Sequence, residues 1–269
     1  MAILTISRGS YSKGKEVSEK VAERLGYECL SRDVILGASE EFRVPEIKLV
    51  RAIHDAPSIL DRFSFGKERY IAYIQSALLQ HFRKDNIVYH GLAGQFFVKG
   101  IAHVIKIRII AEMEDRIKLE MEREGITRAE AIHVLKKDDE ERRKWSQALY
   151  GIDTSDPALY DLVIHINKIK VDDAVDIICQ TAGLKDFQTT DESKRSLDDL
   201  ALAAEVKATL MQVHRDVEVT ADNGTISVKA VAPISKGPSL SRDLEKAAGG
   251  VPGVKETKID VLPLTPFSE

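Results

Sequence analysis

The chain contains little cysteine and carries little net charge. Its 269 residues include only Cys29 and Cys179, and the formal net charge is −4 at pH 7. Two cysteines so far apart in sequence argue against a disulfide framework, and isolated cysteines of this kind are usually buried core thiols. A net charge this close to zero gives no electrostatic reason to expect a nucleic-acid-binding protein.

Long apolar runs are also missing. No stretch approaches the roughly 18 apolar residues of a membrane-spanning helix. The N-terminus lacks the basic region and apolar segment of a signal peptide, so we expect a cytoplasmic protein. Long tandem repeats and low-complexity tracts are absent as well. The 43% hydrophobic and 30% charged residues are typical of a globular chain.

The N-terminus combines an apolar stretch, a glycine-containing turn and a helix. Residues 2–7 are predicted to form a strand, and Gly9 is separated by four residues from Gly14 and Lys15. This is the spacing of a phosphate-binding loop, in which backbone N–H groups face an anion and the lysine reaches the outer phosphates. Glu16 stands where serine or threonine usually helps to hold magnesium.

Several residues of this loop are candidates for binding a nucleotide. The seven candidates are Gly9, Ser10, Ser12, Lys13, Gly14, Lys15 and Glu16. Lys15 is assigned to the β- and γ-phosphates of ATP, because a cation at a helix start opposes the helix dipole. Ser12 and Glu16 are the candidate Mg²⁺ ligands, since hard cations prefer oxygen. The alternatives are a solvated Lys15, a solvated Ser12, and a Glu16 that only complements the dipole.

Strands and helices alternate over the first 185 residues. Strands are predicted at 2–7, 87–90, 104–110 and 162–166, and helices at 16–25, 45–83 with a break near 64–66, 114–124, 127–149 and 173–181. A capping box, Thr127 with Glu130, begins the long charged helix. The alternation predicts a parallel sheet covered by helices, with ligands at the carboxyl ends of the strands.

After residue 185 the composition and the pattern of predicted elements change. Residues 186–197 are polar and are predicted to be a linker. Residues 198–269 are predicted to form a small α+β domain. Its elements are a helix over 198–213, a hairpin over 217–228 with an Asn-Gly turn, a helix over 239–248 and a strand over 254–261.

Residues 1–185 resemble the cytidylate-kinase-like branch of the P-loop nucleoside monophosphate kinases. The resemblance rests on Ile6-Ser7-Arg8 with Gly14-Lys15-Glu16, on Met113-Glu114-Asp115-Arg116-Ile117, and on Lys136 to Arg142 followed by Tyr150-Gly151-Ile152-Asp153. It implies a P-loop fold, a three-layer α/β/α arrangement with a parallel sheet and a helical lid. It also implies ATP and Mg²⁺ as cofactors, and a nucleoside monophosphate, CMP or dCMP, as the phosphoryl acceptor.

The same resemblance implies roles for residues outside the loop. Arg142, Arg143 and Arg116 would belong to the lid and would close on the transferring phosphate. Spacing alone favours a different interpretation, a solvated charge run with pairs four residues apart.

The candidate residues for binding the phosphoryl acceptor lie outside the first loop. Arg32 and Asp33 follow the second strand, and Arg69 follows a predicted helix break. Arg32 has the geometry to bind a monophosphate with two hydrogen bonds, and a simple ion pair within the loop is the alternative.

Three departures from the family pattern support a second hypothesis. Tyr11 and Lys13 replace glycines of the first loop, and His90-Gly91-Leu92 stands where the family has an arginine. These changes favour a nucleotide-binding sensor with little or no kinase turnover as the alternative function.

Residues 198–262 resemble a BON module. The resemblance rests on Asp222-Asn223-Gly224-Thr225-Ile226 and on Val251-Pro252-Gly253-Val254-Lys255. It implies a bacterial protein with a regulatory or tethering module that contacts a protein partner or a lipid surface. A third hypothesis follows, an envelope-associated protein whose main work is done by this module. A homo-oligomer is compatible with all three hypotheses.

Overall fold

The computed structural model describes residues 2–8, 12–31, 33–43, 67–91 and 94–264. The predictions made for Gly9, Ser10, Tyr11, Arg32 and Leu92 therefore lie outside the described residues, as does most of the helix predicted from residue 45.

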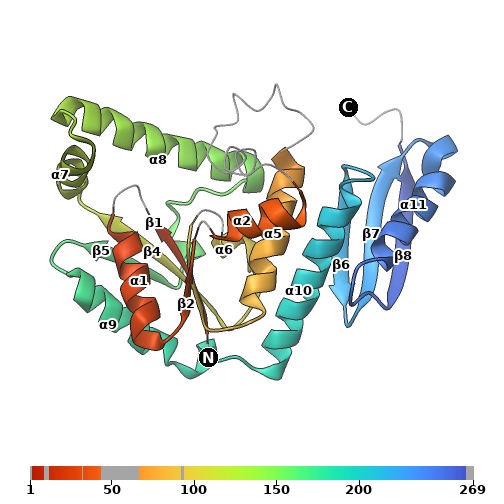
Figure 1. Ribbon diagram of the computed structural model, residues 1–269, viewed down its shortest axis with the longest axis horizontal. Coiled ribbons are helices and arrows are strands. Elements are labelled where there is room, and N and C mark those ends of the chain that lie inside the picture. Colours follow the sequence, from red (N-terminus) through yellow and green to blue (C-terminus); the bar gives the residue numbers. More distant parts are fainter. Residues whose placement is uncertain (1, 9–11, 32, 44–66, 92–93, 265–269) are drawn as a thin grey trace.

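A five-stranded parallel sheet forms the centre of the N-terminal part (Figure 1). Its strands are β1 (Ile3–Arg8), β2 (Glu28–Leu30), β3 (Ile87–His90), β4 (Val104–Ala111) and β5 (Leu162–Ile166). They lie in the order β2-β3-β1-β4-β5, and each neighbouring pair is parallel. The predicted parallel sheet is confirmed.

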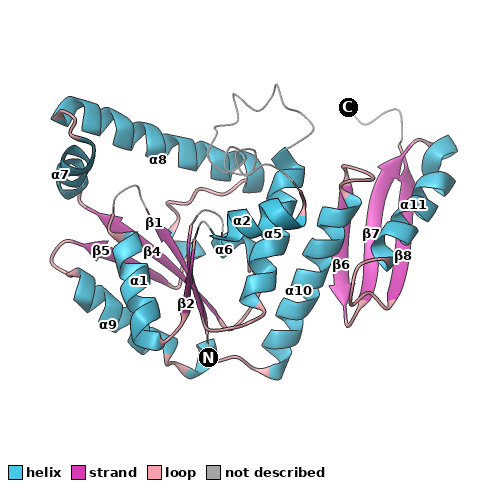
Figure 2. Ribbon diagram, viewed as in Figure 1, coloured by secondary structure: helices cyan, strands magenta, loops and turns pink. Residues whose placement is uncertain are grey.

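Helices cover both faces of this sheet (Figure 2). One face carries α1 (Gly14–Leu25) and α9 (Val171–Ala182), and the other carries α2 (Asp33–Glu41), α5 (Lys67–Phe82) and α6 (Gly94–Phe97). Because side chains alternate along a strand, Leu4 packs into the α1 and α9 core while Ile3 packs into the opposite core. The result is a three-layer α/β/α arrangement.

A helical hairpin extends from the sheet beyond β4. It consists of α7 (Met113–Glu124) and α8 (Arg128–Tyr150). The predicted capping box at the start of α8 is confirmed, since Thr127 accepts from the Glu130 backbone N–H and the Glu130 side chain accepts from Thr127. In Figure 1, α8 crosses above the carboxyl end of β1. This is the position that a lid over the sheet edge would take.

The C-terminal part is a separate three-stranded sheet with two helices. Its elements are α10 (Asp191–Leu210), β6 (Val217–Asp222), β7 (Thr225–Ala232), α11 (Gly237–Gly249) and β8 (Glu256–Pro263). The predicted hairpin is confirmed, because β6 and β7 pair in antiparallel fashion around Asn223 and Gly224. Strand β8 runs parallel to β7, and α11 connects the two.

Helix α10 differs from the prediction at its start. It begins at Asp191 rather than Asp198, because Thr190 caps it by accepting a hydrogen bond from the Ser193 backbone. The segment predicted as a linker therefore contributes the first turns of a helix. Short 3₁₀ helices complete the chain at Pro157–Leu159, Lys185–Phe187 and Ile234–Lys236.

Helix α10 packs against α5 of the N-terminal part. Gln80 Nε2 donates to Glu205 at 2.7 Å, and Arg83 Nε donates to Asp198 at 2.6 Å. The buried residues of α5 and α10 belong to one hydrophobic cluster. Among the described helices, none is long and apolar enough to cross a membrane.

Candidate active site

The described end of the first loop folds back over the last residue of β1. Lys13 adopts a left-handed conformation with φ of 61°, and α1 begins at the next residue. A Cβ atom on Gly14 would lie 2.6 Å from the Cβ of Arg8, so this position has no room for a side chain. The close approach brings the start of α1 to the carboxyl end of β1.

The other loop residues have distinct surroundings. Ser12 is fully buried, and its hydroxyl donates to the Ile109 carbonyl of β4 at 3.1 Å. Lys15 Nζ lies 3.6 Å from Glu19, and Glu16 lies 3.7 Å from Lys20. These two pairs are at the surface, with the Lys15 side chain 63% exposed and that of Glu16 50% exposed.

A cavity of about 230 Å³ lies at the carboxyl edge of the sheet, under α8. Ser7, Ser12, Gly91 and Gln95 form part of its wall. Its charged lining consists of five arginines, Arg8, Arg108, Arg116, Arg142 and Arg143, with two aspartates, Asp139 and Asp153. The excess of guanidinium groups favours an anion, and guanidinium groups match the geometry of phosphate oxygens.

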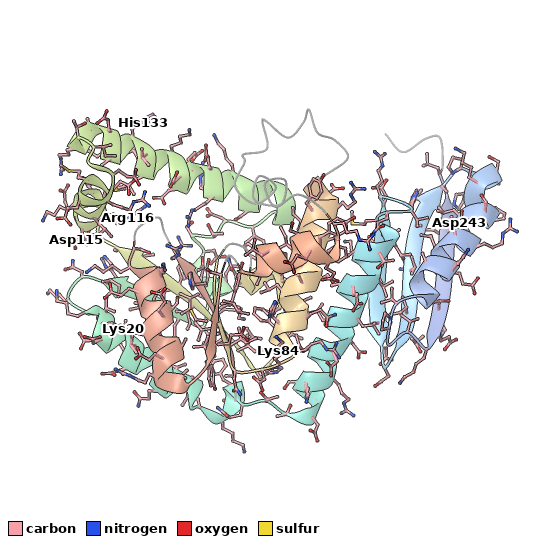
Figure 3. All side chains as sticks on the ribbon, viewed as in Figure 1. Lys20, Lys84, Asp115, Arg116, His133 and Asp243 are labelled. Carbon is pink, nitrogen blue, oxygen red and sulfur yellow. The ribbon has the colours of Figure 1, made fainter. Side chains whose placement is uncertain are left out.

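Two of these arginines link the helical hairpin to its surroundings. Arg142 Nη1 donates to the backbone carbonyl of Arg8 at 2.9 Å, which connects α8 to the end of β1. Arg116 of α7 binds both carboxylate oxygens of Asp139 in α8, at 2.9 and 2.8 Å. Figure 3 shows Arg116 on α7, below α8. Its side chain is only 10% exposed, whereas that of Asp139 is 36% exposed, so solvent reaches the pair from the Asp139 side.

A third arginine connects β4 to the loop after α8. Arg108 is in register with Ser7 of β1, and its guanidinium donates to the Thr154 carbonyl. It also donates to the Tyr160 hydroxyl at 3.2 Å and lies over that ring. Asp153 accepts from the backbone and side chain of Ser155, and these bonds lower the pKa of the Asp153 carboxyl.

The structure brings together some of the sequence-predicted residues. Ser12, Arg116, Arg142 and Arg143 all line the cavity. The side chains of Lys13, Lys15, Glu16 and Arg69 are not part of its wall. Arg69 lies over the Tyr70 ring instead, and its buried Nε has no hydrogen-bond partner among the described residues. Asp33 begins α2, and Arg32 lies outside the described residues.

Arg108 and Gln95 are among the cavity residues that the sequence analysis did not single out. Arg108 had a visible signal, a charged residue inside the apolar stretch 104–110. Gln95 had none, because one glutamine between Gly94 and Phe96 shows no periodic pattern. It lies on α6, a single turn that follows β3.

Within the described part of the chain, no cluster of three or more His, Cys, Asp or Glu side chains is arranged to hold a metal ion. Magnesium in phosphoryl-transfer sites is usually bound by one or two carboxylates and by substrate phosphates rather than by a protein cage.

Comparison with known proteins shows that residues 3–168 match the "Cytidylate kinase-like family". A cytidylate kinase of Staphylothermus marinus is 35% identical over 95 residues, which are 35% of this chain and 53% of the relative. A cytidylate kinase of Pyrococcus horikoshii is 24% identical over 166 residues, 62% of this chain and 80% of the relative. The chain thus spans about half the length of the first of these relatives.

A solved structure supports the fold. An uncharacterized protein from Eubacterium ventriosum aligns with 68% of this chain and 98% of its own, with a TM-score of 0.52 and 21% identity. At this identity the likeness concerns the fold alone. The family match covers more than half of the chain, and it includes the part that holds the parallel sheet, the first loop and the arginine-lined cavity. The chain belongs to the cytidylate kinase-like family.

Proposed function

We propose that the protein transfers the γ-phosphoryl group of ATP to a nucleoside monophosphate, with CMP or dCMP as the expected acceptor. The observation that carries this proposal is the arginine-lined cavity at the carboxyl edge of the sheet, beside the end of the first loop. Phosphoryl transfer needs little covalent help from a protein. It needs positioning of both substrates and positive charge on the transferring group.

The first loop would bind ATP. Backbone N–H groups at the start of α1, together with Gly9, Ser10, Ser12, Lys13 and Gly14, would surround the phosphates. Lys15 would leave Glu19 to reach the β- and γ-phosphates. This exchange costs little, because the 3.6 Å pair is exposed and such pairs contribute about 0–1 kcal/mol.

Magnesium would be held by Glu16 and Ser12 together with the phosphates. The exposed Glu16 carboxylate has a 3.7 Å contact with Lys20, and Ser12 lies at the cavity wall. When bound, the ion neutralises charge on the phosphate oxygens.

The hairpin α7–α8 would act as the lid. Arg142 already reaches the end of β1, so a small change would move its guanidinium from the Arg8 carbonyl to a phosphate oxygen. Arg143 and Arg116 lie in the same wall and would add positive charge. Closure of α8 would also exclude water from the transferring group.

The acceptor would lie on the side of α2 and α5. Arg32, Asp33 and Arg69 are the proposed acceptor-binding residues. The buried Nε of Arg69 has no partner among the described residues, and it would donate to an acceptor phosphate once its surroundings open.

We also propose the division into a kinase domain at 1–185, a connection at 186–197 and a BON-like domain at 198–269. The last would regulate or tether the kinase through a protein partner or a lipid surface, and a homo-oligomer is compatible with it. A bacterial cytoplasm is the proposed location, because the C-terminal part resembles BON modules of bacterial proteins and the proposed reaction consumes ATP.

A nucleotide sensor with little turnover is the second candidate. At least four of the cavity arginines are bound to protein groups: Arg108 to Thr154, Arg116 to Asp139, Arg142 to Arg8 and Arg143 to Glu140. These bonds hold the guanidinium groups in place and leave fewer of their N–H donors for a transferring phosphate, which a sensor tolerates better than a kinase.

An ADP-release assay separates the two functions. The full chain with ATP and Mg²⁺ is tested against CMP, dCMP, UMP, AMP and GMP. We expect acceptor-dependent ADP release that falls by about 100-fold or more in Lys15→Ala, a loss of the size seen when one transition-state donor is removed. Arg24→Ala is the matched control, because it removes a cation from the last turn of the same helix.

Two outcomes would change the proposal. ATP binding without ADP release for any of the five acceptors would favour the sensor. Equal loss in Arg24→Ala would show that the effect of Lys15→Ala comes from the stability of α1 and not from phosphate binding.

A further inference from the structure

Strand β8 is an edge strand of the C-terminal sheet, on the side away from the N-terminal part (Figure 1). Its hydrogen bonds to β7 use every second residue, as the 2.9 Å bond from the Leu264 N–H to the Ala232 carbonyl shows. Because backbone groups alternate along a strand, the N–H and C=O groups of Thr257, Ile259 and Val261 point out of the sheet. None of these groups is bonded to another described segment.

The side chains of β8 alternate between two environments. Ile259 and Val261 pack against the hydrophobic cluster that contains α10 and α11, whereas Lys258 and Asp260 are exposed on the opposite face of the sheet. Within the described part of the chain, neither Lys258 nor Asp260 forms an ion pair. The edge therefore offers backbone donors and acceptors next to one cation and one anion, two residues apart.

A second copy of β8 fits this edge in one antiparallel register. Two identical strands related by a twofold axis pair each residue with its counterpart reciprocally. With the axis at Ile259, Thr257 lies opposite Val261, so the three residues with outward backbone groups all exchange hydrogen bonds. The same register sets each Lys258 opposite an Asp260. These are non-hydrogen-bonded positions, where opposite side chains approach most closely.

The other antiparallel registers of β8 are less favourable. An axis at Lys258 sets this lysine opposite itself, and an axis at Asp260 does the same for the aspartate. Like charges directly opposite each other destabilise a strand pair. An axis at Thr257 or Val261 pairs residues of β8 with positions beyond the end of the strand. Charge and hydrogen bonding therefore select the register centred on Ile259.

The other edge strand, β6, lacks this complementarity. Its exposed charged side chains are Glu218 and Asp222, so pairing with a second copy of itself would bring only acidic side chains together. Strand β6 also lies beside α10, and the two are in contact (Figure 1). An edge strand with charges of one sign resists self-association, whereas β8 carries both signs.

We propose that two copies of this chain associate through antiparallel pairing of β8 with β8, with Ile259 at the twofold axis. The two three-stranded sheets then form one continuous sheet. The N-terminal part lies on the other side of β6, so the pairing leaves the arginine-lined cavity open (Figure 1). The inference does not depend on the proposed phosphoryl transfer.

Sedimentation velocity of the full chain, from micromolar to millimolar concentration, measures the association. Lys258→Asp and Asp260→Lys should each raise the dimer Kd by about 10–100-fold, because each creates two pairs of like charges. The two variants change the net charge in opposite directions, so net charge cannot explain a loss that they share. Combined in one chain they exchange the two charges, and the Kd should return to within about threefold of the wild type.

Two further variants complete the design. Glu218→Lys is the matched control for Asp260→Lys, because it makes the same charge change on β6, and it should leave the Kd within about twofold. Thr257→Pro removes an outward N–H and leaves the bonds between β7 and β8 intact. It should raise the Kd by about 10-fold or more. Thermal unfolding of each variant checks that it is folded.

The outcomes are decisive for the pairing. A chain that stays monomeric at millimolar concentration overturns the inference and leaves the edge to a strand of a different protein. A dimer whose Kd is the same in Thr257→Pro and in both charge variants forms elsewhere, which also overturns it. Failure of the combined variant to recover overturns the pairing of Lys258 with Asp260. ADP release plays no part in these measurements, so failure of the kinase proposal leaves them unaffected.

Discussion

Arg142 and Arg143 are adjacent in the chain but have different surroundings. Arg142 is half-buried and bonded to the Arg8 carbonyl, whereas Arg143 is 57% exposed and pairs with Glu140 three residues before it. Consecutive residues on a helix point about 100° apart, so a helix above a cavity directs only one of them fully inward. The Glu140 carboxyl has a lowered pKa because Arg143 donates hydrogen bonds to it.

These surroundings predict different costs of removing each side chain. Arg142→Ala should lower kcat/KM for the acceptor by about 10²–10³-fold, because it removes the half-buried donor that we propose for the transferring phosphate. Arg143→Ala should lower it by less than about 10-fold, since solvent screens an exposed cation. Steady-state kinetics with saturating ATP measures both. Equal losses in the two variants would contradict the placement of Arg142.

The candidate site could be predicted from the sequence only where its residues lie in a recognisable pattern. The loop spacing identified Ser12 and Gly14, and the resemblance identified Arg116 and Arg142. Gln95 could not be found in this way, because only the folding of α6 against the sheet places it in the cavity wall. That placement is a property of the folded chain rather than of local sequence.

Helices were predicted well where apolar periodicity or a capping signal was strong. Thr127 with Glu130 located the start of α8 correctly. The start of α10 was placed too late, because its first turns are polar and solvent-exposed and so resemble a linker. The parallel direction of β8 could have been inferred from the intervening α11, since parallel strands need a crossover connection.

The contact between α5 and α10 contains a carboxyl group with a shifted pKa. Burial raises the pKa of Glu205, and the Arg83 charge and the Gln80 hydrogen bond only partly offset this effect. Glu41 of α2 also has a raised pKa, from burial and from the negative charge of Glu205. Where α10 meets the N-terminal part, the surroundings of Glu41 and Glu205 therefore make both carboxyl groups harder to ionise.

This arrangement predicts the sign of a pH dependence. The folded protein binds a proton at Glu205 more tightly than the unfolded chain, so this contribution to stability is complete below the ordinary glutamate pKa of about 4.3. It is lost as the pH rises through the raised value. Glu205→Gln keeps an oxygen to accept from Gln80 and cannot ionise.

Urea unfolding of both proteins from pH 4 to pH 8 provides the measurement. As the pH rises, the free energy of unfolding of Glu205→Gln should increase relative to that of the wild type. Asp198→Asn is a useful comparison, because Asp198 lies on the same helix as Glu205, and its replacement removes the ion pair with Arg83 at the end of α5. A wild-type advantage that grows with pH would contradict the assignment to Glu205.

At the scale of the whole molecule, α10 packs against both the N-terminal part and the C-terminal sheet. Its buried residues include Leu197, Ala201, Ala204 and Ala208, and one cluster joins them to Ile3 of β1 and to Val228 of β7. Small alanine side chains allow α10 to lie close to α5 on one side and to β6 on the other. The two parts therefore share a hydrophobic core, which favours one cooperative unfolding transition.

A pair of valines on β7 tests this coupling. Val228 is 1% exposed and Val231 is 41% exposed on the same strand. Val228→Ala should reduce the free energy of unfolding by about 1–3 kcal/mol, from lost burial and a residual cavity, whereas Val231→Ala should change it by less than about 0.5 kcal/mol. Native-state hydrogen exchange measures the opening of individual strands.

The informative comparison is between β7 and β1, which lie at opposite ends of the shared core. If the parts unfold together, Val228→Ala should lower the opening free energy of β1 and β7 amides by the same amount. A loss confined to β6, β7 and β8 would show that the C-terminal part opens alone. In that case the α5–α10 contact would be a docking surface between two units that unfold independently. The C-terminal part would then regulate the N-terminal part by separating from it at this contact.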